Sequence, residues 1–289
     1  MKKIILLLKL TARNFFMKYY YPLVIFSILL INACTPKPYS STNKAYKKQA
    51  KTLSKIIAAI PVDSVRADSL KLPPYWVGTT NFGIRKPNMV IIHHTAQNSC
   101  EQTLKTFTLP RTQVSAHYVI CKDGTLHHML NDYLRAWHAG NAKWGNASDI
   151  NSSSIGIEID NNGFENFTEA QLNTLLGLLA NLKKVYSIPS ANFIGHGDIA
   201  PGRKVDPNVT FPWKRLAERG FGLWYADTTA AIIPDNFNST YALRIVGYDI
   251  SNLVNATQAF RRHFLQSDKQ GELDDAEKKV LYLLMQKYL

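Results

Sequence analysis

The chain has 289 residues, of which 46% are hydrophobic and 19% are charged, and this composition is typical of a globular protein with a buried core. Its net charge of +13 is concentrated at one end, because the first 55 residues hold eleven Lys and Arg residues and no acid. The remaining residues carry a net charge of +2 and contain no nucleic-acid-binding motif, which argues against DNA or RNA as a partner.

The N-terminus has the pattern of a signal peptide over residues 1–33. An apolar run at residues 21–33 follows basic residues and is too short to span a bilayer comfortably. Ala33 followed by Cys34 resembles the lipobox of bacterial lipoproteins, in which the cysteine thiol carries a diacylglycerol. This resemblance implies a protein anchored through Cys34 to a membrane of the bacterial cell envelope, expected to be the periplasmic side of the outer membrane. The alternative is an ordinary secretory signal that contains Cys34 by chance.

Residues 34–74 are predicted to form the lipidated cysteine and a basic tether. Lys, Ser, Thr and Pro dominate this stretch, and no strong apolar pattern appears before Leu53, so only a short helix near residues 53–60 is expected. The globular domain is predicted to begin after two consecutive prolines, at residue 75, and to end at residue 224.

Alternating strands and helices in residues 75–224 predict an α/β fold with a central mixed β-sheet flanked by helices. The strongest helix signal is at residues 167–186, where Thr168 and Gln171 form a capping box and leucines recur at the helical period. The expected strands lie at residues 89–92, 114–121, 125–130, 154–159 and 191–196. Three further helices are expected at residues 242–246, 253–265 and 274–289, and they predict a small helical domain over residues 234–289.

Two of the three cysteines, Cys100 and Cys121, lie inside the predicted globular domain. An exported protein reaches compartments in which disulfides persist, so a bridge between these two residues is one expectation. The other is a pair of small buried thiols, because sequence alone does not show whether the two side chains are close enough.

Seven of the eight histidines lie between residues 93 and 196. His93 ends the first predicted strand, His196 ends the last, and Asp206 follows ten residues later. Two imidazoles and one carboxylate leave a fourth position open on zinc, as in catalytic sites, where the metal activates water for hydrolysis. No H-E-x-x-H helix is present, so a protease of the zincin type is not supported.

Five short motifs resemble those of the type-2 N-acetylmuramoyl-L-alanine amidases, a family that shares its fold with peptidoglycan-recognition proteins and phage lysozyme-type amidases. The motifs occur in family order and are IIHHTA (91–96), SAHY (115–118), AWHAG (136–140), SIGIE (154–158) and GHGDIAPGRKVDP (195–207). The resemblance covers about residues 75–220. It implies zinc-dependent hydrolysis of the amide between N-acetylmuramic acid and the L-alanine of the stem peptide, by an enzyme expected to be a monomer.

The resemblance also implies a set of site residues. Zn²⁺ is expected to be held by His93, His196 and Asp206, with Glu158 as the catalytic carboxylate and Lys204 as a cation beside the metal. Glu158 lies in an otherwise apolar strand, where a carboxylate is costly unless it has a partner or a task. A carboxylate near the metal can move protons, and a cation can stabilise an oxyanion.

The remaining expectations concern substrate binding. His117, Trp137 and His138 are predicted to line the cleft and bind substrate, whereas His94 is expected to support the site without binding metal. Residues 234–289 resemble the helical peptidoglycan-binding unit of lipoprotein amidases. Two alternatives remain, a non-catalytic peptidoglycan-recognition lipoprotein and a zinc peptidase that cuts within the stem peptide. Asp206 at the third ligand position, together with Glu158, favours the enzyme.

Overall fold

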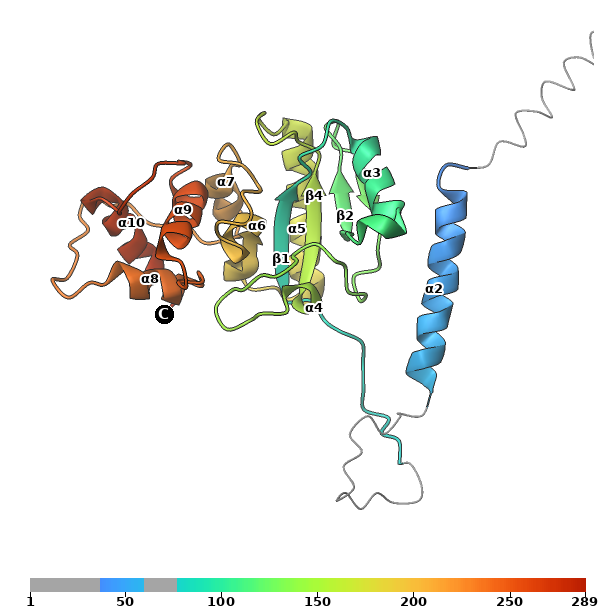
Figure 1. Cartoon of the computed structure of the whole chain (residues 1–289). Coiled ribbons are helices and arrows are strands. Elements are labelled where there is room, and N and C mark those ends of the chain that lie inside the picture. Colours follow the sequence, from blue (N-terminus) through green and yellow to red (C-terminus); the bar gives the residue numbers. More distant parts are fainter. Residues whose placement is uncertain (1–36, 60–76) are drawn as a thin grey trace, which may run out of the picture. The chain divides into compact units, whose positions relative to one another are not determined.

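A five-stranded sheet with the order β3-β2-β4-β1-β5 lies within the unit Thr80–Leu289 (Figure 1). The strands are β1 (Met89–His94), β2 (Tyr118–Ile120), β3 (Leu126–His128), β4 (Ser154–Ile159) and β5 (Phe193–Gly195). β1 runs parallel to both β4 and β5, β2 runs parallel to β4, and only β3 is antiparallel to its neighbour. The mixed sheet and its flanking helices confirm the predicted α/β class.

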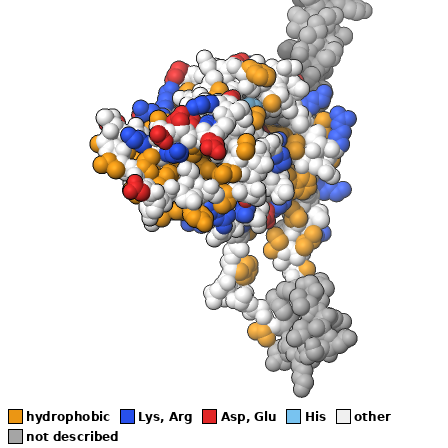
Figure 2. Space-filling view, turned by 60° about the vertical axis from the view of Figure 1, so that its left-hand side comes forward, with side chains coloured by type: hydrophobic (Ala, Val, Ile, Leu, Met, Phe, Trp, Pro, Cys, Tyr) orange, Lys and Arg blue, Asp and Glu red, His pale blue; other side chains and the backbone are white. Residues whose placement is uncertain are grey.

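This computed structural model describes residues 37–59 and 77–289. They belong to two compact units, one ending at Thr79 and one spanning Thr80–Leu289. The predicted signal peptide, the lipidation site Cys34 and residues 60–74 of the predicted tether lie outside the described residues. On the face drawn in Figure 2, basic and acidic side chains lie among hydrophobic and uncharged ones.

The two faces of the sheet pack against different helices because successive strand residues point in opposite directions. Val90 and Ile92 of β1 belong to a core shared with α5 (Glu169–Tyr186), whose leucines face the sheet. Met89 and Ile91 belong to a second core, which contains residues from the C-terminal helices. Thr168 and Gln171 form the predicted capping box at the start of α5.

The C-terminal helices are α8 (Ser239–Val246), α9 (Leu253–Phe264) and α10 (Asp275–Met285), which agrees with the predicted helical segments. Their buried side chains pack on the face of the sheet that carries Ile91 and Ile194. They therefore share a core with the sheet, within the unit Thr80–Leu289. The remaining short helices of this unit are α3 (Cys100–Thr108), η1 (Pro110–Thr112), α4 (Ile150–Ser153), η2 (Ser190–Asn192), α6 (His196–Ile199) and α7 (Trp213–Glu218).

The helix expected within the predicted tether is longer than the sequence analysis placed it, because residues Ser40–Ala58 form the helix α2. The sequence analysis placed only a short helix near residues 53–60. Lys, Ala and Gln have high helix propensity, and this run contains no proline to interrupt them. None of its side chains is buried, which explains why no apolar stripe marks the helix in the sequence. Among the described residues, no helix has the length and apolar character needed to cross a membrane.

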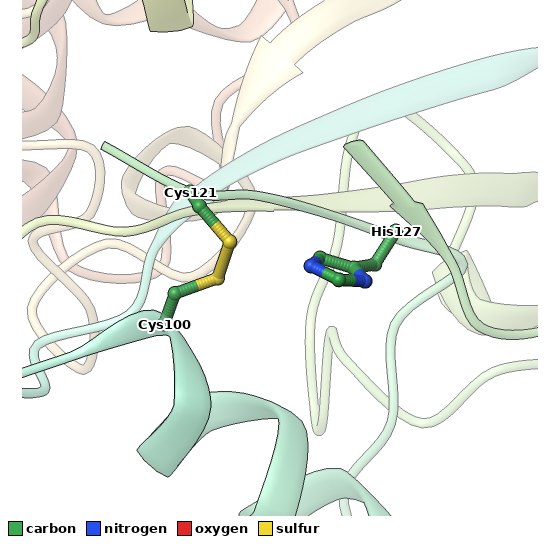
Figure 3. A group of neighbouring side chains, drawn as sticks. All are labelled: Cys100, Cys121 and His127. Atoms are coloured by element: carbon green, nitrogen blue, oxygen red, sulfur yellow. A yellow bond between two sulfur atoms is a disulfide. The ribbon is translucent and has the colours of Figure 1, made fainter. Parts of the chain in front are cut away.

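Cys100 and Cys121 form a disulfide, which confirms the first of the two alternatives considered for them. Cys100 is the first residue of α3 and Cys121 follows β2, and their Cα atoms are 5.2 Å apart. Figure 3 shows the His127 ring of β3 beside the bridge. The bridge ties α3, which was not predicted, to the sheet.

Candidate active site

Three buried side chains converge at the ends of β1 and β5. His93 lies near the end of β1, His196 begins α6 directly after β5, and Asp206 lies in the loop that follows. The Nδ1 atoms of the two histidines are 3.0 Å apart, and each lies 3.0 Å from Oδ2 of Asp206. The structure therefore brings together the three predicted metal ligands.

The protonation of these groups fits a metal site. Burial, followed by the neighbouring His196, lowers the pKa of His93 to about 4, so its ring is neutral at neutral pH. Burial raises the pKa of Asp206, whereas His196 and His93, when they donate to its carboxylate, lower this pKa well below its ordinary value. Neutral imidazole and ionised carboxylate are the forms that coordinate zinc.

A chain of hydrogen bonds fixes the tautomer of His93. The Ser154 hydroxyl donates to the carbonyl of Ile150 over 2.6 Å, so its oxygen accepts from Nε2 of His138 over 3.1 Å. Burial keeps the pKa of His138 well below its usual value, so this neutral ring has an unprotonated Nδ1. That nitrogen accepts from Nε2 of His93 over 3.0 Å, which leaves Nδ1 of His93 with a free lone pair.

His196 is oriented in the same way by a backbone group. Its Nε2 donates to the carbonyl of Ala139 over 3.1 Å, so its Nδ1 also presents a lone pair. Two nitrogen lone pairs and a carboxylate oxygen thus face one point with no proton between them, an arrangement that a divalent cation stabilises. Ligand atoms bound tetrahedrally at zinc distances are separated by roughly 3.3 Å. The observed separations of 3.0 Å therefore fit Zn²⁺.

The loop that carries His138 is held close to β4. The side chain of Asn151 accepts hydrogen bonds from the backbone N–H groups of His138 and Ala139, at 3.1 and 2.9 Å. Gly156 lies beneath the His138 ring, and a Cβ atom at this position would lie 2.5 Å from the ring. The absence of a side chain at Gly156 therefore lets His138 reach His93.

Glu158 and Lys204 lie beside the ligands. Glu158 pairs in register with His93 across β4 and β1, and its Oε2 atom is buried without a hydrogen-bond partner among the described residues. Burial and the charge of Asp206 raise the pKa of Glu158 to about 8, while the positive charge of Lys204 opposes this shift. A carboxylate with a raised pKa close to metal ligands is suited to proton transfer.

These groups open into a cleft of about 410 Å³. The three ligands, Glu158 and Lys204 line its floor, together with His138. Phe107, Trp137 and Val205 also line the cleft, and Trp137 is 51% exposed. The cleft thus combines a polar centre with apolar side chains, as ligand sites commonly do.

The structure does not bring His117 to the cleft, so its predicted contact with substrate is wrong. His117 is fully buried, and its Nδ1 accepts the backbone N–H of Gly156. His138 reaches the cleft, but both of its ring nitrogens are used to hold His93 and Ser154. His94 lies outside the ligand set, as expected, and accepts the backbone N–H of Asn208.

Sequence reasoning missed the Ser154–His138 relay. Its signal was present in the β4 alternation, where Ser154, Gly156 and Glu158 share the face opposite the buried isoleucines. A serine and a glycine on the same face as Glu158 indicate that another side chain packs closely there.

Comparisons with known proteins agree with this site. Residues 84–209 match the family described as N-acetylmuramoyl-L-alanine amidase. The chain is 30% identical over 231 residues to the N-acetylmuramoyl-L-alanine amidase AmiD of Escherichia coli, covering 69% of this chain and 83% of AmiD.

Two solved structures resemble about three quarters of this chain. One is AmiD from E. coli in complex with the substrate anhydro-N-acetylmuramic acid-L-Ala-D-gamma-Glu-L-Lys, with a TM-score of 0.64, 27% identity, and coverage of 78% of this chain and 97% of AmiD. The other is AmpDh3 from Pseudomonas aeruginosa in complex with an anhydromuramic pentapeptide, with a TM-score of 0.64, 29% identity, and coverage of 76% and 99%. The chain belongs to the N-acetylmuramoyl-L-alanine amidase family of enzymes.

Proposed function

We propose that the protein is a zinc-dependent hydrolase of the amide that joins N-acetylmuramic acid to L-alanine in peptidoglycan or its fragments. Zn²⁺ is held by His93, His196 and Asp206. The observation that carries this proposal is that Nδ1 of His93, Nδ1 of His196 and Oδ2 of Asp206 lie 3.0 Å from one another. The hydrogen bond of each Nε2 atom fixes the tautomer of its ring. A merely wall-binding protein has no need of such a donor set.

The residues around the ligands have separate tasks in this reaction. Bound Zn²⁺ supplies Lewis acidity, which makes water a better nucleophile and polarises the amide carbonyl. Glu158 accepts a proton from the attacking water and passes it to the departing amine of L-alanine. Lys204 places a positive charge where the carbonyl oxygen becomes negative. The C–N bond breaks, leaving a carboxylate on the muramyl lactyl group and a free amine on the peptide.

The substrate proposed for the cleft is a muramyl peptide. AmiD and AmpDh3 have been solved with anhydromuramyl peptides bound, and the cleft of about 410 Å³ lies in the range of small-molecule sites. Trp137 is proposed to pack against the sugar or the stem peptide, because half of its surface is exposed at the cleft.

Analysis of new chain ends tests this function. Soluble protein from residue 35 onward is incubated with purified sacculi or anhydromuropeptides, with and without a chelator, and the products are identified by mass spectrometry. We expect new free amines on the first L-alanine, lost with chelator and restored by Zn²⁺. Cuts within the stem peptide would indicate a peptidase, and the absence of cuts would indicate a recognition protein.

Glu158→Gln separates metal binding from catalysis. The amide is nearly the same size as the carboxylate but cannot accept the proton, so we expect zinc content to remain and turnover to fall by about 10²–10⁴-fold. Zinc is measured by mass spectrometry of the native protein and turnover by chromatography of the released peptide. Turnover within twofold of wild type would remove Glu158 from its proposed role.

We also propose that Cys34 carries a lipid that anchors the protein to a membrane of the bacterial cell envelope. The support is the apolar run at residues 21–33, which ends in Ala33 and is followed directly by Cys34. Cells fed an alkyne-tagged fatty acid should label the wild-type protein but not Cys34→Ser. Equal labelling of both proteins would exclude this attachment site.

A further inference from the structure

A buried carboxylate links the metal-ligand segment to the C-terminal helices. Asp198 lies two residues after His196 and is 4% exposed. Its Oδ2 accepts the backbone N–H of Gly195 over 2.8 Å and the Nδ1–H of His263 over 2.7 Å. Its Oδ1 accepts the hydroxyl of Tyr248 over 2.8 Å. His263 belongs to α9, and Tyr248 follows α8, so two of the three donors come from the C-terminal helices.

The surroundings make this link rigid. His263 is 5% exposed, and its ring stacks on Trp213 of α7 with a centroid separation of 4.0 Å and an interplanar angle of 13°. Tyr248 is fully buried and packs edge-on against Trp144. In Figure 1, α9 lies beside α6 and α7, in agreement with the contacts between these helices. A buried charge-assisted network of this kind has few other arrangements available to it.

The segment that Asp198 anchors carries two of the three metal ligands. Within residues 195–206, the backbone N–H of Gly197 donates to the carbonyl of Asp206 over 2.7 Å, and this bond ties one ligand region to the other. The segment also packs against α9 at Gly202, where an added Cβ atom would lie 2.1 Å from the side chain of Asn255. α9 therefore contacts this segment both near its start and near its end.

We propose that His263 and Tyr248 are positioning residues for the metal centre. Through Asp198 they hold residues 195–206 in the shape that presents His196 and Asp206 to the ion. The inference rests on the proposed zinc chemistry and assigns the C-terminal helices a task in the catalytic unit. It goes beyond wall binding, the role expected for these helices from the sequence.

His263→Phe and Tyr248→Phe test this inference in the full-length chain. His263→Phe keeps a ring that can stack on Trp213 but removes the donor to Asp198. Tyr248→Phe removes only the hydroxyl group that donates to Asp198. Leu281→Ala is the matched control, because Leu281 is fully buried in the same helical core and forms no polar link to the ligand segment. His263→Asn restores an N–H close to the position of Nδ1 and serves as the rescue variant.

Zinc affinity is measured by competition with a chromophoric chelator, the metal geometry by the visible spectrum of the Co²⁺ form, and stability by thermal melting. We expect His263→Phe to weaken zinc binding about tenfold and to alter the Co²⁺ spectrum, as outer-shell changes do. Tyr248→Phe should have a smaller effect in the same direction, and His263→Asn should recover most of the affinity. Leu281→Ala should lower the melting temperature and leave both metal readouts unchanged.

Wild-type metal affinity and Co²⁺ spectra in both phenylalanine variants would overturn the positioning role and leave a structural one. An equal loss of affinity in Leu281→Ala would also overturn it, because any destabilisation would then suffice. If His263→Phe does not fold, Tyr248→Phe carries the test. A wild-type protein that binds no zinc would refute the proposed function itself, a result distinct from either outcome in the variants.

Discussion

Gly156 has no side chain, and this leaves room for the His138 ring that hydrogen-bonds to His93. Gly156→Ala places a Cβ where the His138 ring now lies, so the ring must move and its hydrogen bond to His93 must lengthen. We expect zinc affinity to fall by about 10–100-fold, the range found when a residue behind a metal ligand is lost. Competition with a chelator measures this affinity.

Gly177→Ala is the control for this substitution. Gly177 lies within α5, and no atom lies within 4 Å of the Cβ that alanine would add. This change should leave zinc affinity unaltered and stabilise the protein by about 1 kcal/mol, because alanine favours the helix. Wild-type zinc affinity in Gly156→Ala would show that the His138 contact does not support the metal centre.

His117 makes the free energy of unfolding depend on pH. Burial is the main reason that its pKa falls to about 4, whereas an unfolded histidine titrates near 6.5. Its stabilising contribution is therefore complete above about pH 6.5 and is lost as the pH falls toward 4. Between pH 7 and pH 5 this residue alone should reduce the free energy of unfolding by about 2 kcal/mol.

His117→Asn tests this assignment, because its side-chain oxygen can replace Nδ1 as acceptor for the Gly156 N–H but does not titrate. Urea unfolding in the presence of chelator, at pH 7 and pH 5, measures the difference. The variant should lose about 2 kcal/mol less than wild type over this interval. An identical decline in both proteins would place the acid sensitivity elsewhere.

Sequence analysis could identify site residues that are marked by their amino-acid type and their position in a motif. It failed for residues whose role depends on the direction in which the side chain points. His93, His196, Asp206 and Glu158 could be identified because metal and proton chemistry require those side chains. His117 and His138 have the same chemistry as each other and both lie in motifs. Only the structure shows that one is buried against Gly156 and the other supports His93.

At the scale of the elements, a disulfide bond attaches the helix α3 to the sheet. The disulfide between Cys100 and Cys121 closes a loop with a sequence separation of 21 and joins the start of this helix to the end of β2. A loop of this length removes unfolded-state entropy worth about 3 kcal/mol. Thr103, Thr106 and Phe107 of α3 line the cleft, so the disulfide also fixes one wall of the cleft.

A paired Cys100→Ser and Cys121→Ser variant should therefore lower the free energy of unfolding by about 3 kcal/mol. Denaturant titration measures this loss, and adding reductant to the wild-type protein should produce the same curve. A reductant that destabilises the double variant equally would show that the effect does not come from this bridge.

α5 could be predicted because its leucines recur at the helical period and because Thr168 and Gln171 mark a helix start. The strands could be predicted from short runs of β-branched and apolar residues. α3 and the first part of α2 lack this pattern. Thr, Gln and Lys dominate them, and their helicity comes from propensity and, for α3, from Ser99 as N-cap. Periodicity carries no information about a helix that buries few side chains.

On the scale of the whole molecule, the C-terminal helices cover one face of the sheet. The sequence predicted a small helical domain at residues 234–289, and in the structure these helices share a core with the sheet. Ile91 and Ile194 of the sheet lie in the same core as Leu243 and Phe260. A composition shift after residue 224 marks a change of element type but does not show which surfaces meet.

Deleting residues 234–289 should therefore expose the side of the sheet that carries Ile91. We expect the shortened protein to be recovered mainly as aggregate, or to melt well below the full chain, as followed by circular dichroism and analytical size exclusion. A soluble truncated protein with an unchanged melting temperature would contradict the shared core. Point variants on exposed positions of α8 and α9 are the better probes of wall binding.

The ligands His93 and Asp206 lie 113 positions apart in the chain, and the helices that cover Ile91 and hold Asp198 come later still. During synthesis every coordinating side chain leaves the ribosome before α9 does. A nascent chain can thus contain all three donors and still lack the architecture that aligns them. The proposed positioning by His263 and Tyr248 therefore predicts that hydrolytic competence requires the docking of the last helices.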